Sequence, residues 1–426
     1  MPLENILKTA KKTALTLAAS AMFFTGINYQ NNNAYSQSVK KTKTQPVQEV
    51  KNSKFPEKDL KVVEIPFWRI AYSEGITAEL DISGNNKVMV FEHRQSEKSD
   101  IFLANIGSEE AIKLDLGPGF HREPSIDYKG RNIVFSSETD TSKGEIWLAD
   151  LDKMKLINLS NHPDADFQPS IDDNGEKVIF TSERNKKSEI YLVQLKKSKP
   201  EKLINFSNDK KSWYYFPQIS GNGKNVVYAK EDARQSIWVK ETENPYGEKM
   251  LEEHSNYWYM DPQISRDGTR IAWTRVKKQE SSNKKKIFLA DIVTGDKFEI
   301  SNGENSERPS ISANGEYIAW LEGSSIIGEY KIKVQDTKTR KIEKLGISLP
   351  SGLLENEYLS RDGINSTNHF FRISPDGKFL GIFLPHKSGA IYGIGNPHEE
   401  PGLMYTVDEK EIKNPKKKES LYGNDK

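Results

Sequence analysis

The segment FQPSIDDNGEKVIFTSE, residues 167–183, determines the fold of this chain. It begins with Pro169 and Ile171, passes through a polar Asp-Asn-Gly corner, and enters a run in which Val178 and Phe180 alternate with Ile179. This order is typical of a short strand, a tight turn and a second strand. An isolated hairpin is at best marginally stable in water, so the chain must supply further strands to complete the sheet.

The same pattern occurs seven times along the chain. The five complete copies begin with PSIDYKG (124–130), PSIDDNG (169–175), PQISGNG (217–223), PQISRDG (262–268) and PSISANG (309–315), and weaker copies occupy 80–94 and 371–385. The turn positions are separated by 44, 45, 48, 45, 47 and 62 residues, and they are Asn86, Gly130, Gly175, Gly223, Gly268, Gly315 and Gly377. Gly and Asn tolerate the positive φ of a tight reversal, and Pro is tolerated at the first residue of an incoming strand. The spacing predicts a tandem array of one structural unit.

Two further apolar runs follow each hairpin, as at 189–195 and 202–207. Four short strands in about 45 residues, without a helical period, are typical of a propeller blade. The sequence therefore predicts an all-β propeller of four-stranded antiparallel blades. Seven turns favour seven blades, and the weak first copy leaves six as the alternative.

The last unit needs strands from elsewhere in the chain, because a closed ring cannot leave a sheet edge open. We expect its third strand at 403–408, after an insertion at 385–402. The segment 59–68 is strand-like and is expected to pair as the outer strand of the last blade. The stretch 347–367 lacks repeat character and is predicted to form a long loop.

These repeats resemble the TolB-like β-propeller family. That family's pattern combines Asp-x-x-Pro with a Ser-Pro-Asp-Gly turn, and here Asp166 and Pro169 match the opening while SPDG at 374–377 matches the turn. The resemblance covers roughly residues 76–410 and implies the propeller fold, while a role in a Tol-like system follows from it by family-level analogy only. The chain departs from TolB itself, because a polar segment stands where TolB has an α/β domain ahead of its propeller.

The predicted organisation places the propeller at 59–410, between two polar segments. Lys8, Lys11 and Lys12 precede the uncharged stretch 13–27, the pattern of a signal peptide at 1–36 or of an uncleaved signal anchor. Residues 37–58 read as a disordered linker and 411–426 as a disordered basic tail. We therefore expect an exported protein, periplasmic or extracellular, with membrane contact only through an uncleaved N-terminal segment.

Composition and motifs argue against catalysis. Lys and Arg total 62 against 61 Asp and Glu, which gives no basic field for nucleic acid, and there is no Cys. No Gly-x-Ser-x-Gly elbow, His-Glu-x-x-His helix or phosphate-binding Gly loop occurs, and the seven His residues show no ligand spacing. The expectation is a non-enzyme with no cofactor and no metal; the alternative is a hydrolase or lyase site assembled from several blades at the channel mouth.

The residues just before each Pro are expected to gather at one end of the propeller channel. SWYYFP (212–217) and NYWYMDP (256–262) occupy equivalent places in neighbouring units. Exposed Trp and Tyr clusters commonly anchor protein partners, and such rings also stack on sugars. The predicted partner-binding residues are Trp213, Tyr214, Tyr215, Tyr257, Trp258, Tyr259, His121, Arg122, Phe167 and His369. The alternative is that these rings pack between blades.

The resulting hypothesis is a monomeric, exported scaffold that binds a protein or peptide at the cell envelope through one propeller face. The alternative is a carbohydrate-binding or carbohydrate-cleaving propeller. The second function would require carboxylates such as Glu123, Asp166 and Asp261 to face a cleft beside the aromatic rings.

Overall fold

The computed structural model describes one unit of the chain within residues 67–395. Residues outside the description are 1–66, 73–75, 96–97, 107–110, 140–141, 210, 245, 279–283, 302–304, 325–328, 340–341, 351–370, 378, 385–389 and 396–426. The described residues form strands and turns, without a helix. In this part of the chain no helix has the length and hydropathy to cross a membrane. The predicted signal segment, linker and basic tail lie outside the described residues.

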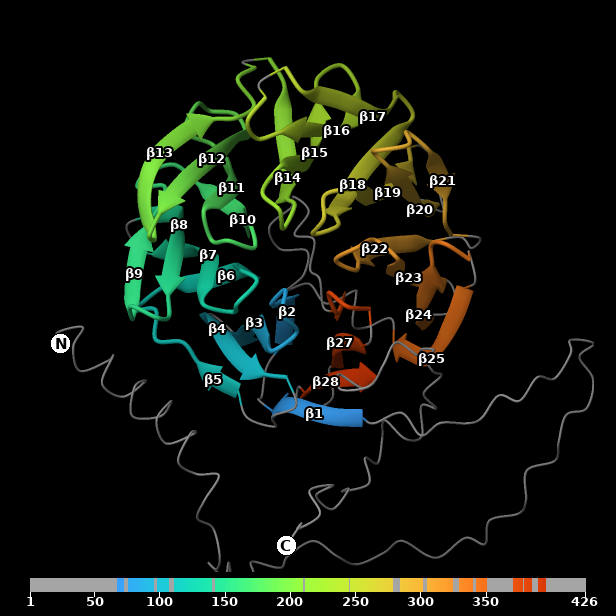
Figure 1. Cartoon of the computed structure of the whole chain (residues 1–426), viewed down its shortest axis with the longest axis horizontal. Helices are drawn as coiled ribbons and strands as arrows, with labels where there is room; N and C mark the ends of the chain where they lie inside the picture. The colour runs from blue at the N-terminus through green and yellow to red at the C-terminus, as the bar shows by residue number, and fades with distance from the viewer. Residues whose placement is uncertain are drawn as a thin grey trace, which may run out of the picture. The chain divides into compact units, whose positions relative to one another are not determined.

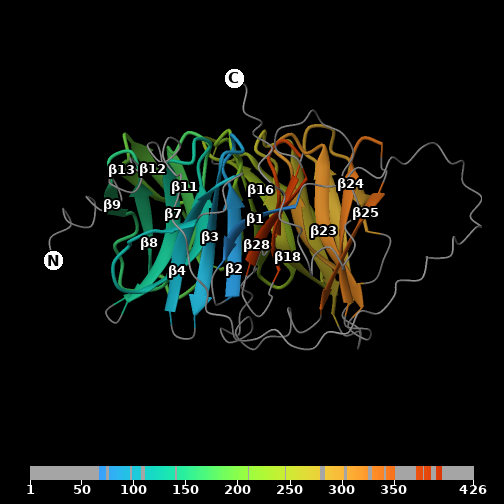
Figure 2. The same cartoon turned by 90° about the horizontal axis from the view of Figure 1, so that it is seen from below.

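Seven four-stranded antiparallel sheets are arranged in a ring around a central channel (Figures 1 and 2). The first three blades are β2 (Ile76–Ile82), β3 (Val88–Gln95), β4 (Lys98–Asn105) and β5 (Ala111–Lys113); β6 (Phe120–Ile126), β7 (Asn132–Thr139), β8 (Ser142–Asp150) and β9 (Lys155–Asn158); and β10 (Asp166–Ile171), β11 (Lys177–Ser182), β12 (Glu189–Lys196) and β13 (Lys199–Asn205). In each of them the first strand lies nearest the channel (Figure 1).

The remaining blades continue the same order. They are β14 (Trp213–Ile219), β15 (Asn225–Glu231), β16 (Gln235–Glu241) and β17 (Glu248–His254); β18 (Tyr257–Ile264), β19 (Arg270–Lys277), β20 (Lys285–Asp291) and β21 (Lys297–Glu299); β22 (Ser306–Ile311), β23 (Tyr317–Ser324), β24 (Glu329–Asp336) and β25 (Ile342–Pro350); and β26 (Phe371–Ile373), β27 (Phe379–Leu384) and β28 (Ala390–Gly395) with β1 (Phe67–Tyr72). The prediction of a propeller with four-stranded antiparallel blades is confirmed.

The seventh blade is completed by β1, the first strand within the described residues. β1 pairs antiparallel with β28, from Phe67 opposite Ile394 to Tyr72 opposite Ala390. A segment ahead of the repeats therefore closes the last blade, as predicted. The observed strand begins at Phe67, so only the end of the expected segment 59–68 lies in it, and 59–66 falls outside the described residues.

Two expectations about the last blades were wrong. The third strand of blade seven is β28 at 390–395, within the stretch expected to be an insertion, and not 403–408. Gly393 and Gly395 lower its intrinsic strand preference, which concealed it in the sequence. β25 extends to Pro350, so residues 347–350 are strand and not loop, while 351–367 lie outside the described residues.

The repeat Pro does not start its strand. In blades two to six it lies inside the innermost strand at a register shift, as between Phe167 and Ser170. The residue before each of these Pro has a left-handed backbone, with φ between 53° and 58° at Glu123, Gln168, Phe216, Asp261 and Arg308. A β-bulge accounts for both observations, and the free channel edge of the innermost strand tolerates the missing N–H of Pro.

The turns of the hairpins agree with the prediction. Asn86 has φ 59° and Gly223 has φ 66°, the left-handed conformation that the reversal requires. Backbone hydrogen bonds also join successive turns: Tyr128 N–H donates to Asp173 O (3.2 Å) and Asp173 N–H donates to Gly221 O (2.8 Å). Comparable bonds join blade one to two, four to five, five to six and six to seven. We call this side of the ring the turn face.

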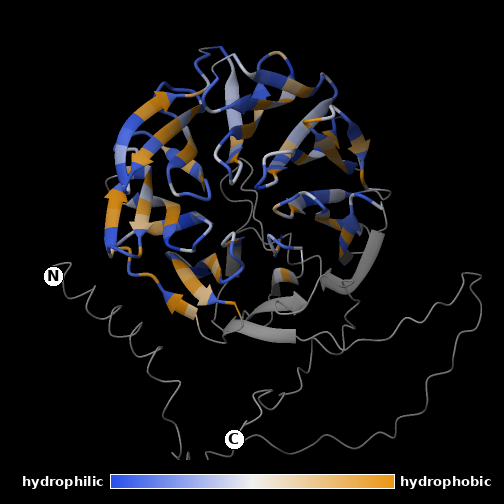
Figure 3. Cartoon of the chain, in the orientation of Figure 1, coloured by the Kyte–Doolittle hydropathy of each residue, from blue (hydrophilic) through white to orange (hydrophobic). Residues whose placement is uncertain are grey.

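The core lies between blades. Val134 and Ile146 of blade two pack in one cluster with Val178 and Phe180 of blade three, and similar clusters join other neighbouring blades. Strands carry alternating hydrophobic and hydrophilic segments in Figure 3, whereas the connecting loops are mainly hydrophilic. Each sheet buries both faces against its neighbours, which stabilises blades that would not fold alone.

Candidate functional site

The innermost strands present alternate residues to solvent and to the core at their N-terminal ends. Four positions before the Pro, Trp213 of β14 is 39 % exposed and Trp258 of β18 is 42 % exposed. Tyr215 and Tyr257 are half-buried and pack against the core cluster between blades four and five. We call these four residues the aromatic rim; they lie on the innermost strands of two neighbouring blades, at the strand ends opposite the turn face.

Two of the predicted contact residues are core residues instead. Tyr214 and Tyr259, three positions before the Pro, are each 1 % exposed. The Tyr214 ring lies 5.7 Å from that of Tyr228, and its hydroxyl donates to Asp209 Oδ2 (3.2 Å). Burial raises the pKa of both Tyr214 and Tyr259. The expectation that the six aromatic residues share one surface is therefore wrong for these two, because side chains alternate along a strand.

The other predicted residues differ in their exposure. His121 is buried, with its ring 5.6 Å from that of Phe135 and Nε2 3.2 Å from Gly117 O, and burial lowers its pKa. Arg122 is half-buried and lies over the ring of Phe120 at 5.5 Å. Phe167 is half-buried in blade three, and His369 lies outside the described residues. His121 is therefore not available as a contact residue.

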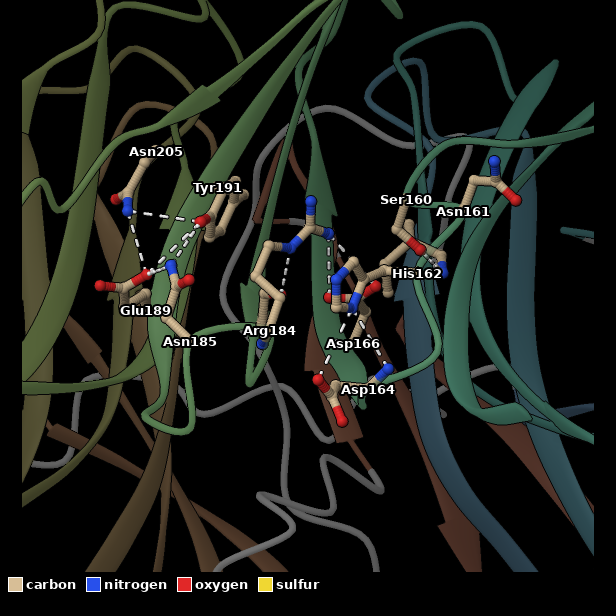
Figure 4. A network of polar contacts seen from close by, with 12 residues as sticks. Ser160, Asn161, His162, Asp164, Asp166, Arg184, Asn185, Glu189, Tyr191 and Asn205 are labelled. Carbon is tan, nitrogen blue, oxygen red and sulfur yellow. Dashed lines mark hydrogen bonds and ion pairs between the residues drawn. The ribbon is translucent and has the colours of Figure 1, made fainter.

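Asp166, proposed for the carbohydrate alternative, is part of a buried ion pair. Its carboxylate is fully buried and accepts from Arg184 Nη2 at 3.2 and 3.4 Å. Arg184 also donates to Ser182 Oγ (2.7 Å) and lies 4.2 Å above the ring of Tyr191 (Figure 4). A further network around Glu189 and Tyr191 follows on the other side of Arg184 (Figure 4). These groups are already bound to each other within blade three.

Asp261 also does not face a cleft beside the rim. It is 5 % exposed, and burial raises its pKa to about 6, against the lowering effect of Arg308. Glu123, the third carboxylate of the carbohydrate hypothesis, borders a channel cavity of about 40 Å³. The arrangement of carboxylates beside aromatic rings that this function requires is not present among the described residues.

Sequence reasoning missed a ring of polar side chains that line the channel. They follow the repeat Pro or its equivalent, and they are Asp81, Ser125, Ser170, Gln218, Gln263, Ser310 and Arg372. Several accept a backbone N–H of the next blade: Ile126 N–H donates to Asp81 Oδ2 (3.1 Å) and Ile219 N–H to Ser170 Oγ (3.2 Å). The signal was visible as a polar residue between Pro and Ile in every complete copy.

Buried acidic residues gather on the blade-one side of this channel. Glu92 pairs with Arg94 and accepts from Ser99 Oγ (2.8 Å), while Glu123 accepts from Gln168 N–H (2.6 Å). Glu79 lies with Glu123 on the wall of a cavity of about 40 Å³. Burial and the neighbouring Glu123 and Glu92 raise the pKa of Glu79, and burial raises that of Glu123.

Arg266 crosses the channel at the turn face. It belongs to blade five, yet it pairs with Asp173 of blade three and donates through Nη2 to Ile82 O of blade one (2.7 Å). These blades are not neighbours in the ring (Figure 1). The side chain therefore obstructs this end of the channel, on the far side of the cavity from the rim.

Comparisons with known proteins agree with this architecture. Residues 70–255 match the TolB beta propeller domain family, and no curated protein matches the chain. Among solved structures, oligogalacturonate lyase from Vibrio parahaemolyticus has a TM-score of 0.54 at 11 % identity, over 79 % of this chain and 98 % of that one. A puromycin-hydrolyzing peptidase from Mycobacterium tuberculosis has 0.54 at 12 % identity, over 76 % and 52 %.

TolB from Acinetobacter baumannii is a further similar structure, with a TM-score of 0.45 at 19 % identity over 61 % of this chain and 63 % of that one. At identities this low, structural similarity indicates the fold and not the activity. Residues 70–255 of the chain thus match the model of the TolB beta propeller domain, and four-stranded blades continue the ring to residue 395.

Proposed function

We propose that this protein is an exported, non-catalytic scaffold that binds a partner protein or peptide at the cell envelope through the face carrying the aromatic rim. The observation that carries the proposal is the exposure of Trp213 and Trp258 at equivalent positions of two neighbouring blades. Large aromatic side chains held on a rigid scaffold are frequent hot spots of protein interfaces. Export is proposed from the signal-like N-terminal sequence.

The local surroundings suit a rigid contact surface. Both tryptophans belong to strands that are paired along their length, so little side-chain or backbone freedom would be lost on binding. Lys278 Nζ lies 5.8 Å from the Trp258 ring, and Arg275 lies 4.5 Å from that of Tyr257. Arg275 is paired with Glu252 (2.9 Å), so the positive charge at the rim comes from Lys278, and the rim favours a partner surface that is apolar at its centre with an acidic group at its edge.

The expected contribution of each tryptophan follows from its exposed area. At about 40 % exposure, an indole side chain retains about 100 Å² that a partner could cover. Burial of this area contributes about 2 kcal/mol, so each Trp→Ala change should weaken binding roughly 30-fold.

The test uses the intact exported protein. Proximity labelling identifies the partner, and its Kd is then measured for wild type, Trp213→Ala and Trp258→Ala. Tyr246→Ala is the matched control, because Tyr246 is 93 % exposed but lies in the loop between β16 and β17, away from the rim. Equal affinity of both Trp variants and wild type, or capture of a glycan in place of a protein, would reject the proposal.

A further inference from the structure

Glu79 is a buried carboxylate without a hydrogen bond or ion pair inside the described part of the chain. It lies on β2 at the position that Glu123 and Gln168 occupy in the next two blades, and it is 9 % exposed. Its side chain forms part of the wall of the channel cavity, together with Glu123 and Arg372. A carboxylate buried to this degree normally has partners that satisfy its oxygens.

The neighbouring acids already have their partners. Glu92 accepts from Arg94, from Ser99 Oγ and from Glu123 N–H (3.2 Å). Glu123 accepts from Gln168 N–H and from Ser136 Oγ (3.3 Å). Both contribute to the contacts between or within blades, whereas no hydrogen bond or ion pair joins Glu79, on the wall of the same cavity, to another described residue.

The charges around Glu79 do not balance. The groups that act on it are the carboxylates of Glu123 and Glu92 and the guanidiniums of Arg372 and Arg94. Arg372 is also bound to Leu80 O (3.1 Å) and to Gln263. With Asp81, which lines the same cavity, four carboxylates stand against two guanidiniums, and burial and the neighbouring Glu123 and Glu92 raise the pKa of Glu79. A cation in the cavity would reduce this excess of negative charge.

The cavity favours a compact organic cation. Its volume is about 40 Å³, and it shares Asp81, Ser125 and Gln218 with the adjoining channel cavity of about 80 Å³. A primary ammonium is a compact charge with three donors, whereas a guanidinium is larger and planar. Among the described residues, no three acidic or histidine side chains are placed so that they could hold a metal ion.

The side from which a ligand arrives is defined by Arg266. This residue crosses the channel at the turn face, so the cavity lies between Arg266 and the aromatic rim. We propose that the channel binds a primary ammonium group beside Glu79, presented by the partner as a lysine side chain or as a chain N-terminus. The inference extends the proposed function and rests on it for the identity of the carrier, whereas binding of small amines can be measured without the partner.

The experiment titrates the full-length protein with three primary amines by calorimetry at about pH 7, where alkyl ammonium groups and most α-ammonium groups remain charged. n-Butylamine tests the ammonium alone, Nα-acetyl-lysine methylamide tests a side chain, and alanine methylamide tests an N-terminus. We expect millimolar or tighter binding of n-butylamine. The stronger of the two peptide-like ligands identifies the source of the group.

Glu79→Gln should weaken n-butylamine binding about ten-fold or more, because it removes the charge that accepts the ammonium. Glu138→Gln is the matched control, since Glu138 is exposed on β7 and its affinity effect should be nil. Circular dichroism and thermal unfolding confirm that both variants are folded. Tetramethylammonium, which has no donor, should not bind.

Three results would overturn the inference: no binding of any amine, unchanged affinity of Glu79→Gln, or equal binding of tetramethylammonium. The two proposals fail separately. Partner capture that depends on Trp213 and Trp258 without amine binding would retain the proposed function and reject the ammonium site. If amine binding depends on Glu79 but partner capture is unchanged in both Trp variants, the ammonium site is retained and the proposed function is rejected.

Discussion

The ion pair between Asp166 and Arg184 should be among the most sensitive polar contacts of blade three. Asp166 is fully buried and the Arg184 side chain is 11 % exposed. Replacing Arg184 by Gln leaves a buried carboxylate without its cation, and breaking such a pair costs about 3 to 5 kcal/mol. Because Arg184 keeps slight contact with solvent, we expect a loss near the lower end, about 3 kcal/mol of unfolding free energy, measured by urea denaturation at neutral pH.

A double-mutant cycle separates the charge pair from the packing of Arg184 on Tyr191. Asp166→Asn removes the acid, and the double variant should be less destabilised than the sum of the single variants, by about 2 kcal/mol. Arg184→Lys keeps the charge but not the planar fork, and is expected to lose about 1 kcal/mol. Strict additivity, or a loss below about 1 kcal/mol for Arg184→Gln, would refute the interpretation of this contact as a buried, energetically coupled pair.

Two further predictions concern backbone and titration. Burial raises the pKa of Asp261 from its ordinary value of 3.8 to about 6, so the wild-type protein should lose stability as the pH rises from about 4 through about 6. Asp261→Asn should not show this loss and should be more stable than wild type by up to about 3 kcal/mol at neutral pH. Urea denaturation at several pH values measures the difference. A pH-independent difference would contradict this. Gly223→Ala places a Cβ 2.7 Å from Asp172 Oδ2 at φ +66° and should cost more than the roughly 1–2 kcal/mol of the left-handed backbone alone. Gly295→Ala, at φ +83° with open space around it, is the control that should show the backbone cost only, so equal losses would exclude the steric contribution.

Most of the fold could be predicted because its signals are local and repeated. Each unit contains a Gly or Asn turn followed by an alternating strand, and all seven turn residues have a positive φ in the structure: Asn86, Gly130, Gly175, Gly223, Gly268, Gly315 and Gly377. The last blade was predicted less well. Its third strand, β28, contains Gly393 and Gly395, which have a low intrinsic strand preference. The strand therefore depends on its pairing with β27 and β1.

The candidate sites were only partly predictable, because burial depends on which face of a strand meets the next blade. Trp213 and Tyr214 are adjacent in sequence, yet one is exposed and the other is core. The bulge at each repeat Pro could not be predicted from the sequence, because the residue before a Pro ordinarily avoids the helical region and favours extended backbone. The environment of Glu79 arises from blades one, two and seven together, and no single repeat contains it.

The pairing of β1 with β28 has a consequence for how the molecule is made. The earliest strand of the propeller has to wait for a partner that is synthesised more than three hundred residues later. A chain that is still being synthesised therefore contains six blades without a closed ring. Fragments that end before residue 390 should be prone to aggregation and sensitive to proteases. A chain that extends through Gly395 can pair β1 with β28, which protects the propeller from unfolding at either end.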